Sequence, residues 1–314
     1  MKLVGLHHIT MITANAEGTV DFYADVLGLR LVKKTVNFDD PTAYHLYFGD
    51  ELGAPGSILT WFEYQGARQG QAGAGMIHTI QLGVSSVEAL AFWADRLAAH
   101  DYDSGRESTS LRFADGEGLG LELVIADEAN PPLRAVHPQI PAEFAIVGLE
   151  GARAYAPYAN VEETVLTETL GFDYEGEGRY QLDGSQRRFR WTFERPAGEG
   201  RGGAGTVHHI AWATEDEEQL AWQQRITDAG GFVTPVLDRD YFTSIYFREP
   251  RGVLFEIATL SPGFATDEDP EHLGEELRVP KMHASLRAQL EQTLEPIVNP
   301  RIADTLSVTP SQDP

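Results

Sequence analysis

The stretch Leu6-His7-His8-Ile9, close to the start of the chain, returns close to its end as Val207-His208-His209-Ile210. Each copy is followed by a stretch with helical spacing of apolar residues and then by strand-like runs. Two further copies of this order of elements lie between them. The chain is therefore predicted to consist of four βαβββ units, whose approximate bounds are 5–63, 76–126, 144–194 and 207–260.

Short motifs set the register between these copies. Leu27-Gly28-Leu29 ends the first helical stretch, and Leu170-Gly171-Phe172 ends the third at the corresponding point. The closing strand Gly118–Glu122 of the second unit corresponds to Gly252–Glu256 in the fourth. One βαβββ unit has an open sheet and a single helix, so it must pair with another unit to close a core. The predicted fold class is α+β, with paired units forming two domains.

Polar and glycine-rich segments separate the units, and the segment that contains Asn130-Pro131-Pro132 is the best candidate for a domain boundary. We expect an N-terminal domain over 1–135 and a C-terminal domain over 140–265, each with two units. The tail, 266–314, begins with an acidic segment. It continues with a helix around 284–294, where leucines four residues apart predict packing on the body of the protein.

Composition excludes several classes of protein and of site. The chain has 314 residues, with 24 Lys and Arg against 48 Asp and Glu, and a formal net charge of −24. Such a charge repels phosphate backbones and anionic lipids, so neither nucleic acid nor a membrane surface is an expected partner. No apolar run approaches a membrane span, and no export signal precedes the first histidines, which predicts a cytoplasmic protein. Because there is no cysteine, any metal must be held by His, Asp or Glu.

The repeat turns two of the histidines into candidate metal ligands. Because side chains alternate along a strand, one member of each His-His pair is expected to face a shared cavity, and the second members, His8 and His209, are in register. Glu256 lies in an apolar run, where a carboxylate is costly to bury without a partner. Two imidazoles and one carboxylate form the facial triad that leaves positions on Fe(II) open for substrate and O2. The predicted site therefore combines units one and four.

The other two units offer an incomplete set. His78 and Glu122 of the second unit are matched to ligand positions, but the third unit has Gly151 where the remaining histidine would lie. We therefore expect no second metal centre, and interpret His78 and Glu122 as structural residues.

At this point the sequence resembles the vicinal oxygen chelate superfamily, of the glyoxalase and extradiol dioxygenase type. Within it, the chain is similar to dioxygenases that cleave the ring of hydroquinones and chlorohydroquinones. The resemblance covers nearly the whole chain, and the motifs that carry it are Leu6-His7-His8-Ile9-Thr10, Tyr44–Gly53 with Pro55-Gly56, Asp238–Phe242, Tyr246, Gly252–Glu256, and Gly263-Phe264 with Asp267–Asp269.

This resemblance implies a mononuclear Fe(II) or Mn(II) site and ring cleavage of a small aromatic substrate by O2. Its metal ligands fall on His8, His209 and Glu256. It further implies catalytic supporting roles for His7, Arg239 and Tyr246, with Tyr246 folded back beside Glu256 as a proton donor. The two hydroxyls of a hydroquinone are para to each other, so only one can reach the metal. The substituents of the ring, the choice between iron and manganese, and the existence of a homo-oligomer stay open.

Two alternatives remain. A glyoxalase-like metal-dependent isomerase or lyase would need a second carboxylate, but the register assigns that position to Thr60, and Glu63 falls on the opposite strand face. A non-catalytic protein that sequesters small molecules would need neither the matched histidines nor Glu256. His45 and Trp61 are expected mainly as wall or core residues.

Overall fold

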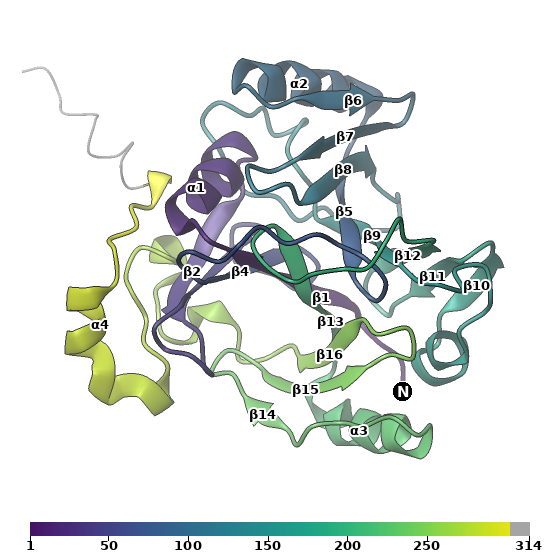
Figure 1. The fold of residues 1–314 in the computed structure, drawn as a ribbon. Coiled ribbons are helices and arrows are strands. Elements are labelled where there is room, and N and C mark those ends of the chain that lie inside the picture. The colour runs from purple at the N-terminus through teal and green to yellow at the C-terminus, as the bar shows by residue number, and fades with distance from the viewer. Residues whose placement is uncertain (302–314) are drawn as a thin grey trace, which may run out of the picture.

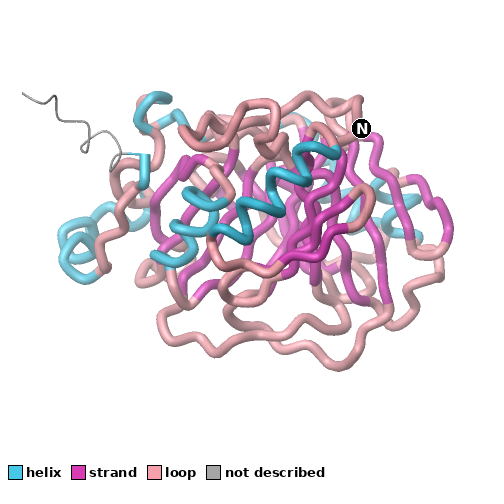
Figure 2. The backbone as a smooth tube through the Cα atoms, turned by 90° about the horizontal axis from the view of Figure 1, so that it is seen from above, coloured by secondary structure: helices cyan, strands magenta, loops and turns pink. Residues whose placement is uncertain are grey.

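Two eight-stranded sheets form the body of this computed structural model, which describes residues 1–301 (Figure 1). The first sheet has the order β14-β15-β16-β13-β1-β4-β3-β2, and the second has the order β10-β11-β12-β9-β5-β8-β7-β6. Figure 2 shows the strands in the centre and the helices outside them. The α+β class and the four βαβββ units are thereby confirmed.

The first sheet joins the first unit to the fourth. Its two central strands, β1 and β13, pair antiparallel, and each pairs on its other side with the closing strand of its own unit. The eight strands are β1 (Gly5–Thr13), β2 (Arg30–Val36), β3 (Tyr44–Gly49), β4 (Ile58–Glu63), β13 (Thr206–Thr214), β14 (Leu237–Asp238), β15 (Thr243–Arg248) and β16 (Leu254–Thr259).

The second sheet joins the second unit to the third through the antiparallel pair β5 and β9. Its strands are β5 (Ile77–Val84), β6 (Ser104–Arg106), β7 (Ser110–Ala114), β8 (Gly120–Ile125), β9 (Leu149–Tyr155), β10 (Asp173–Gly176), β11 (Arg179–Asp183) and β12 (Arg188–Glu194). Each sheet therefore takes one unit from either half of the chain. This grouping differs from the bounds 1–135 and 140–265, which remain a prediction about how the chain divides.

Helices follow the first strand of every unit. In the first unit α1 (Ala16–Val20) continues as the π-helix η1 (Asp21–Val26), and the Asn15 side chain caps its start. The third helix ends on Gly171, whose φ of 82° suits glycine. The other helices of the units are α2 (Val87–Ala99), η2 (Val165–Leu170), η3 (Asp216–Glu218) and α3 (Gln219–Asp228). No helix within residues 1–301 is long and apolar enough to cross a membrane.

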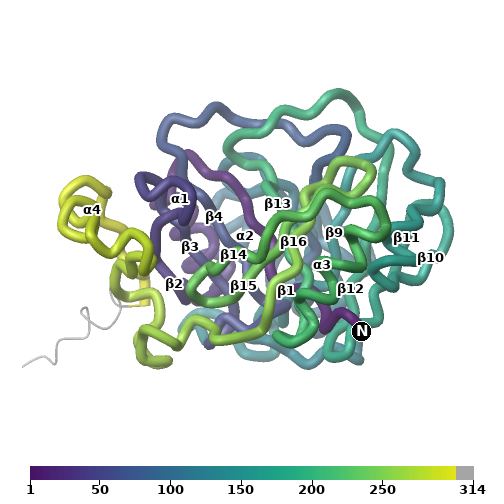
Figure 3. The backbone as a smooth tube through the Cα atoms, turned by 90° about the horizontal axis from the view of Figure 1, so that it is seen from below, coloured from purple at the N-terminus to yellow at the C-terminus, as the bar shows by residue number. Residues whose placement is uncertain are grey.

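The tail runs back along the outer strands of the first unit. It contains η4 (Phe264–Thr266), η5 (Pro270–His272), η6 (Lys281–Leu286) and α4 (Arg287–Thr293). The predicted helix around 284–294 is present, and Leu290 is buried, as expected for a helix that packs on the body. Figure 3 shows α4 beside β2 and far from β10 and β11. Residues 302–314 of the predicted tail lie outside the described residues.

Aromatic side chains fill the space between the sheets. Trp191 of the second sheet packs edge-on against Trp212 and Phe255 of the first, with ring centroids 6.2 and 5.5 Å apart. All three are fully buried. Because strand side chains alternate, this core occupies one face of the first sheet and leaves the other face for a site.

A β-bulge interrupts the first strand of every unit at the same point. In each case one residue is skipped in the pairing with the neighbouring first strand: His7 in β1, His78 in β5, Glu150 in β9 and His208 in β13. A bulge re-aims side chains and is common beside functional sites. It explains why both histidines of a pair can lie on the side of the candidate site.

Candidate metal centre

Three side chains converge on the free face of the first sheet: His8 of β1, His209 of β13 and Glu256 of β16. One atom from each lies within 4.8 Å of the others, and all three side chains are buried. Nε2 of His209 is 2.9 Å from Oε2 of Glu256, and Nε2 of His8 is 3.4 Å from that oxygen. The two Nε2 atoms are 3.3 Å apart. The trio predicted from the repeat is thus brought together.

Pairing across three adjacent strands produces this convergence. Ala211 of β13 lies opposite His8 on one side and opposite Glu256 on the other. His209 precedes Ala211 by two residues, so its side chain points to the same face. The long separation in sequence is bridged by the β1–β13 pair at the centre of the sheet.

The trio fits a divalent ion. Ligands about 2.1 Å from a metal and at right angles to one another are about 3 Å apart, close to the spacing found here. Oε2 of Glu256 is buried without a hydrogen-bond partner among the described residues, whereas Oε1 accepts a hydrogen bond from Oγ of Ser244. A buried, unpartnered carboxylate oxygen that faces two imidazole nitrogens is what metal coordination would satisfy.

Each of the two histidine ligands is held by the histidine before it. Nδ1 of His7 is 2.8 Å from Nδ1 of His8, and Nδ1 of His208 is 2.7 Å from Nδ1 of His209. When the ligand's Nδ1 carries the proton and donates it to the neighbour, its Nε2 is left with a lone pair for a metal. The bulge residues therefore fix both the orientation and the tautomer of the ligands.

Charge states at neutral pH also favour metal binding. Burial alone would raise the pKa of Glu256, but the imidazoles of His8 and His209 hold it well below its usual range. Burial lowers the pKa of His209, although Glu256 opposes this. Burial, and then the adjacent His8, lower the pKa of His7 to about 3. The carboxylate is therefore ionised, and the imidazoles of His7 and His209 are neutral.

We expect replacement of His7 by leucine to weaken metal binding by about 10- to 100-fold, the usual effect of removing a partner from a metal-bound histidine. The matched control is His78→Leu, which changes the same bulge position in the second sheet and should leave metal affinity unchanged. Competition with a coloured chelator measures both variants. Equal metal affinity in His7→Leu and the wild type would show that the Nδ1 contact does not support the ligand.

A small pocket opens beside the trio, and its volume is about 300 Å³ including the mouth. Its wall is largely aromatic, with polar groups interspersed. The lining residues are His8, Asn37, Phe38, Asp39, His45, Tyr47, Phe62, His209, Arg239, Phe242 and Tyr246. His45 is thus part of the wall, as expected, whereas Trp61 is buried against Tyr23 in the core.

Two of the predicted supporting residues form one side of this pocket. Tyr246 of β15 lies opposite Glu256 in the strand pairing, and its ring centroid is 5.7 Å from that of His209. The Arg239 guanidinium lies 5.5 Å from the Tyr246 ring centroid and 3.2 Å from the carboxylate of Asp39. Burial, and then the charge of Glu256, raise the pKa of Tyr246. Burial alone would lower the pKa of Arg239, but Tyr246 and Asp39 raise it.

Several wall residues were not predicted from the sequence. Phe38 and Asp39 come from the loop between β2 and β3, and Phe242 from the loop before β15. Loop residues have no periodic pattern that would place them. Tyr47 and Phe62 lie on strands, and the alternation of side chains relative to His45 and Thr60 could have indicated which face they occupy.

At the corresponding place in the second sheet, the positions equivalent to His8 and His209 are held by other residues. The bulge at His78 shows that the match of His78 to a ligand position is off by one residue: Thr79 lies opposite Arg153 as His209 lies opposite Thr10. His78 instead donates to or accepts from Thr79, with Nδ1 and Oγ1 2.9 Å apart. The ligand positions are therefore occupied by Thr79, Gly151 and Glu122, of which only Glu122 is a metal-binding type.

In the second sheet, guanidinium groups neutralise the buried carboxylate, as a metal ion would in the first. The buried carboxylate of Glu122 pairs with Arg153 at 2.9 Å and with Arg112 at 3.1 Å, and accepts a 2.7 Å hydrogen bond from Gln81. Burial alone would raise the pKa of Glu122, but these partners lower it. Glu122 is thus a satisfied structural residue, as the sequence indicated.

The position of a second carboxylate on the first sheet is filled by a hydroxyl. Thr60 donates a hydrogen bond to Oγ1 of Thr10 at 2.9 Å. Glu63 points to the other face, where it accepts a hydrogen bond from the backbone N–H of Ala16 at the start of α1. The second carboxylate that a glyoxalase-type site would use as a fourth ligand is therefore not present at this position.

Comparison with known proteins places this chain in a family. The model of the Glyoxalase/Bleomycin resistance protein/Dioxygenase superfamily matches residues 5–129 and 164–257. A Bacillus subtilis protein named as a ring-cleaving dioxygenase, MhqO, is 44% identical over 94% of this chain and 97% of its own length. The chlorohydroquinone/hydroquinone 1,2-dioxygenase of Sphingobium indicum is 33% identical, over 95% of this chain and 98% of that protein.

Solved structures agree. A crystal structure of a Bacillus subtilis protein described as a dioxygenase has a TM-score of 0.88 and 42% identity, and covers 95% of this chain and 98% of that one. Glyoxalase I from Zea mays, at 14% identity and a TM-score of 0.58, shares the fold over 83% of this chain and 92% of its own. The chain belongs to the glyoxalase, bleomycin resistance protein and dioxygenase superfamily, and within it to the ring-cleaving dioxygenases.

Proposed function

We propose that this protein cleaves a hydroquinone-type aromatic ring with O2, using Fe(II) or Mn(II) held by His8, His209 and Glu256. The observation that carries the proposal is the spacing of the three ligand atoms, all within 4.8 Å, at the edge of an aromatic pocket. The hydroquinone dioxygenase named among the relatives supports the substrate class. The net charge of −24 disfavours nucleic acid and anionic membranes as partners. We further propose a cytoplasmic location.

The side chains around the trio can each be given a role. When bound, the divalent ion favours the phenolate form of a coordinated hydroxyl and offers open positions for substrate and O2. Phe38, Phe62 and Phe242 hold the ring by apolar contact and exclude water. Ser244 fixes Glu256 by donating to Oε1. Arg239 supplies a positive charge beside the pocket and orients Tyr246.

Tyr246 is the group best placed to move a proton. Its raised pKa keeps the proton on Oη at neutral pH, and its register places it beside Glu256. A phenol in this position can donate to an oxygen atom of substrate or O2 as negative charge develops there. His7 acts through His8, by holding its ring, and does not line the pocket.

Replacement of Tyr246 by phenylalanine is expected to lower turnover by about 100-fold, the lower range for loss of a general acid. Metal content should be unchanged, because the three ligands remain. Tyr180→Phe, which removes a buried phenol in the second sheet, is the matched control and should retain wild-type turnover. Steady-state oxygen uptake and metal analysis of both proteins provide the measurement; unaltered turnover in Tyr246→Phe would exclude it as the proton donor.

An oxygen electrode tests the proposed function itself. Hydroquinone should support uptake of one O2 per ring opened, and catechol should be a poorer substrate. The hemithioacetal of methylglyoxal and glutathione should give no isomerisation. Turnover of hydroquinone under strict exclusion of oxygen, or isomerisation of the hemithioacetal, would contradict a dioxygenase and favour the glyoxalase-like alternative.

A further inference from the structure

A second tyrosine lines the pocket, at the position of the first unit that is equivalent to Tyr246 in the fourth. In the fourth unit Tyr246 of β15 lies opposite Glu256 of β16, and in the first unit Tyr47 of β3 lies opposite Thr60 of β4. Both tyrosines line the pocket, one from each half of the sheet. Tyr47 is thus a phenol whose partner in the strand pairing is a threonine, whereas the partner of Tyr246 is the candidate ligand Glu256.

The hydrogen bonds behind Tyr47 fix which way its proton points. Oγ1 of Thr60 uses its own proton to donate to Thr10, so toward His45 it acts as an acceptor. Nε2 of His45, 2.9 Å from Oγ1 of Thr60, must therefore carry the proton of that ring. Because burial lowers the pKa of His45 well below its usual value, the ring is neutral and its Nδ1 is an acceptor.

Tyr47 is consequently the donor to His45. Its hydroxyl oxygen is 2.8 Å from Nδ1 of His45, and the only proton on that oxygen is used in this bond. Burial, and then Tyr246 and Glu256, raise the pKa of Tyr47, so it stays a phenol. Toward a ligand in the pocket, Oη of Tyr47 can therefore act only as a hydrogen-bond acceptor.

The other polar groups of the wall are engaged with one another or lack an acceptor. The carboxylate of Asp39 is paired with the Arg239 guanidinium at 3.2 Å. Arg239 has only N–H donors, so it cannot accept a proton from a ligand hydroxyl. The amide of Asn37 donates to Oη of Tyr64, and its oxygen accepts from the backbone N–H of Asp39. An acceptor that demands a proton from the ligand is therefore provided by Tyr47, on the wall formed by the first unit.

We propose that Tyr47, oriented by His45, accepts a hydrogen bond from the second hydroxyl of a para-diphenol whose first hydroxyl is at the metal centre. The inference rests on the proposed function, and assigns Tyr47 as a residue that determines specificity. Tyr246 lies beside the carboxylate of the metal site, whereas Tyr47 lies on a strand separated from β13 by β4 and β1. An aromatic ring bound between the metal centre and Tyr47 would direct one hydroxyl to the metal and the para hydroxyl to Tyr47.

The test measures ligand binding without turnover. Protein loaded with Mn(II) is titrated in the absence of oxygen with hydroquinone and with 4-methylphenol, which replaces the second hydroxyl by a methyl group of similar size. The wild type should bind hydroquinone at least about tenfold more tightly, since a buried acceptor without its proton donor disfavours the methyl ligand. In Tyr47→Phe the two affinities should agree within about twofold.

Tyr241→Phe is the matched control, because this buried phenol packs near Tyr47 but donates to Asp267 and does not line the pocket. It should keep the wild-type ratio. A tenfold ratio that survives in Tyr47→Phe would overturn the inference while the proposed function stands. So would a wild type that binds both ligands equally, a result that does not depend on the folding of any variant. A wild type that binds Mn(II) but neither ligand would overturn the proposed function, and the inference with it.

Discussion

We expect His209→Ala to lower bound metal from one ion per chain to less than about a tenth, and to abolish oxygen uptake with hydroquinone. Loss of a partner outside the ligand shell already weakens metal binding by about 10- to 100-fold, and loss of a ligand should weaken it further. Only His8 and Glu256 would remain, which come from strands that are not adjacent. Metal analysis after gel filtration and an oxygen electrode measure the two effects.

The control for this variant lies in the second sheet. Thr79 occupies the position that His209 occupies in the first, so Thr79→Ala tests whether a change at this point of a first strand affects the fold. It should retain metal and turnover. His209→Ala should also keep a wild-type circular dichroism spectrum, since the cavity it creates adjoins the pocket. Full metal content in His209→Ala would refute the assignment of this ligand.

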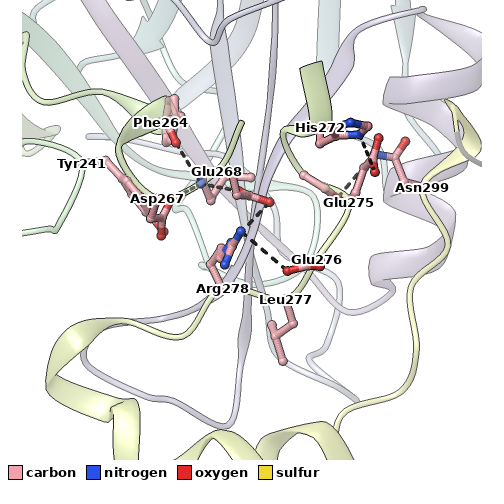
Figure 4. A network of polar contacts seen from close by, with 12 residues as sticks. Tyr241, Phe264, Asp267, Glu268, His272, Glu275, Glu276, Leu277, Arg278 and Asn299 are labelled. Atoms are coloured by element: carbon pink, nitrogen blue, oxygen red, sulfur yellow. Dashed lines mark hydrogen bonds and ion pairs between the residues drawn. The ribbon is translucent and has the colours of Figure 1, made fainter. Parts of the chain in front are cut away.

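The second large effect concerns stability. Lys33 of β2 is completely buried and donates to the backbone carbonyl of Phe264 at 2.9 Å and to Oδ1 of Asp267 at 2.6 Å. It also donates to the buried carboxylate of Glu268. Figure 4 shows Phe264, Asp267 and Glu268 gathered at one place, with Arg278 beside Glu268. This ion-pair cluster fastens the start of the tail to the first sheet.

We expect Lys33→Met to lower the free energy of unfolding by about 3 to 5 kcal/mol, because it leaves the carboxylate of Glu268 buried with too little positive charge nearby. Arg278 is 3.5 Å from that carboxylate and compensates only in part. The double variant Lys33→Met with Glu268→Gln should recover part of the loss, since no buried charge remains. Denaturant unfolding, followed by tryptophan fluorescence, measures these changes.

The adjacent Lys34 provides the comparison. Its Nζ donates to the backbone carbonyl of Ile297 at 3.0 Å, and no carboxylate within residues 1–301 is its direct partner. Lys34→Met should therefore lower the free energy of unfolding by only about 1 kcal/mol. Similar losses for the two variants would mean that burial of the methylene chains, and not the ion-pair cluster, accounts for the effect.

Much of the fold and the metal trio could be predicted because a repeat converts sequence position into spatial position. The matched pairs His7-His8 and His208-His209 indicated two first strands that face a shared cavity, and Glu256 fell on the closing strand of the fourth unit. The helix in the tail followed from leucine spacing, and Leu290 is buried as expected. In each case a periodic pattern carries the information.

What could not be predicted depends on features without a period. A bulge shifts the register by one residue, and for this reason His78 was matched to the position that Thr79 holds. Which units share a sheet is decided by pairing between distant strands, so the bounds 1–135 and 140–265 could not indicate the grouping. The orientation of the Tyr47 proton depends on Thr60 and His45 together, a chain of hydrogen bonds that sequence alone does not reveal.

Anomalous diffraction from crystals grown with Fe(II) or Mn(II) tests the central claim most directly. Data collected on either side of the metal absorption edge should show one strong peak between Nε2 of His8, Nε2 of His209 and Oε2 of Glu256, about 2.1 to 2.3 Å from each. A fully loaded crystal with its anomalous peak elsewhere, and none among these three atoms, would contradict the proposed metal centre.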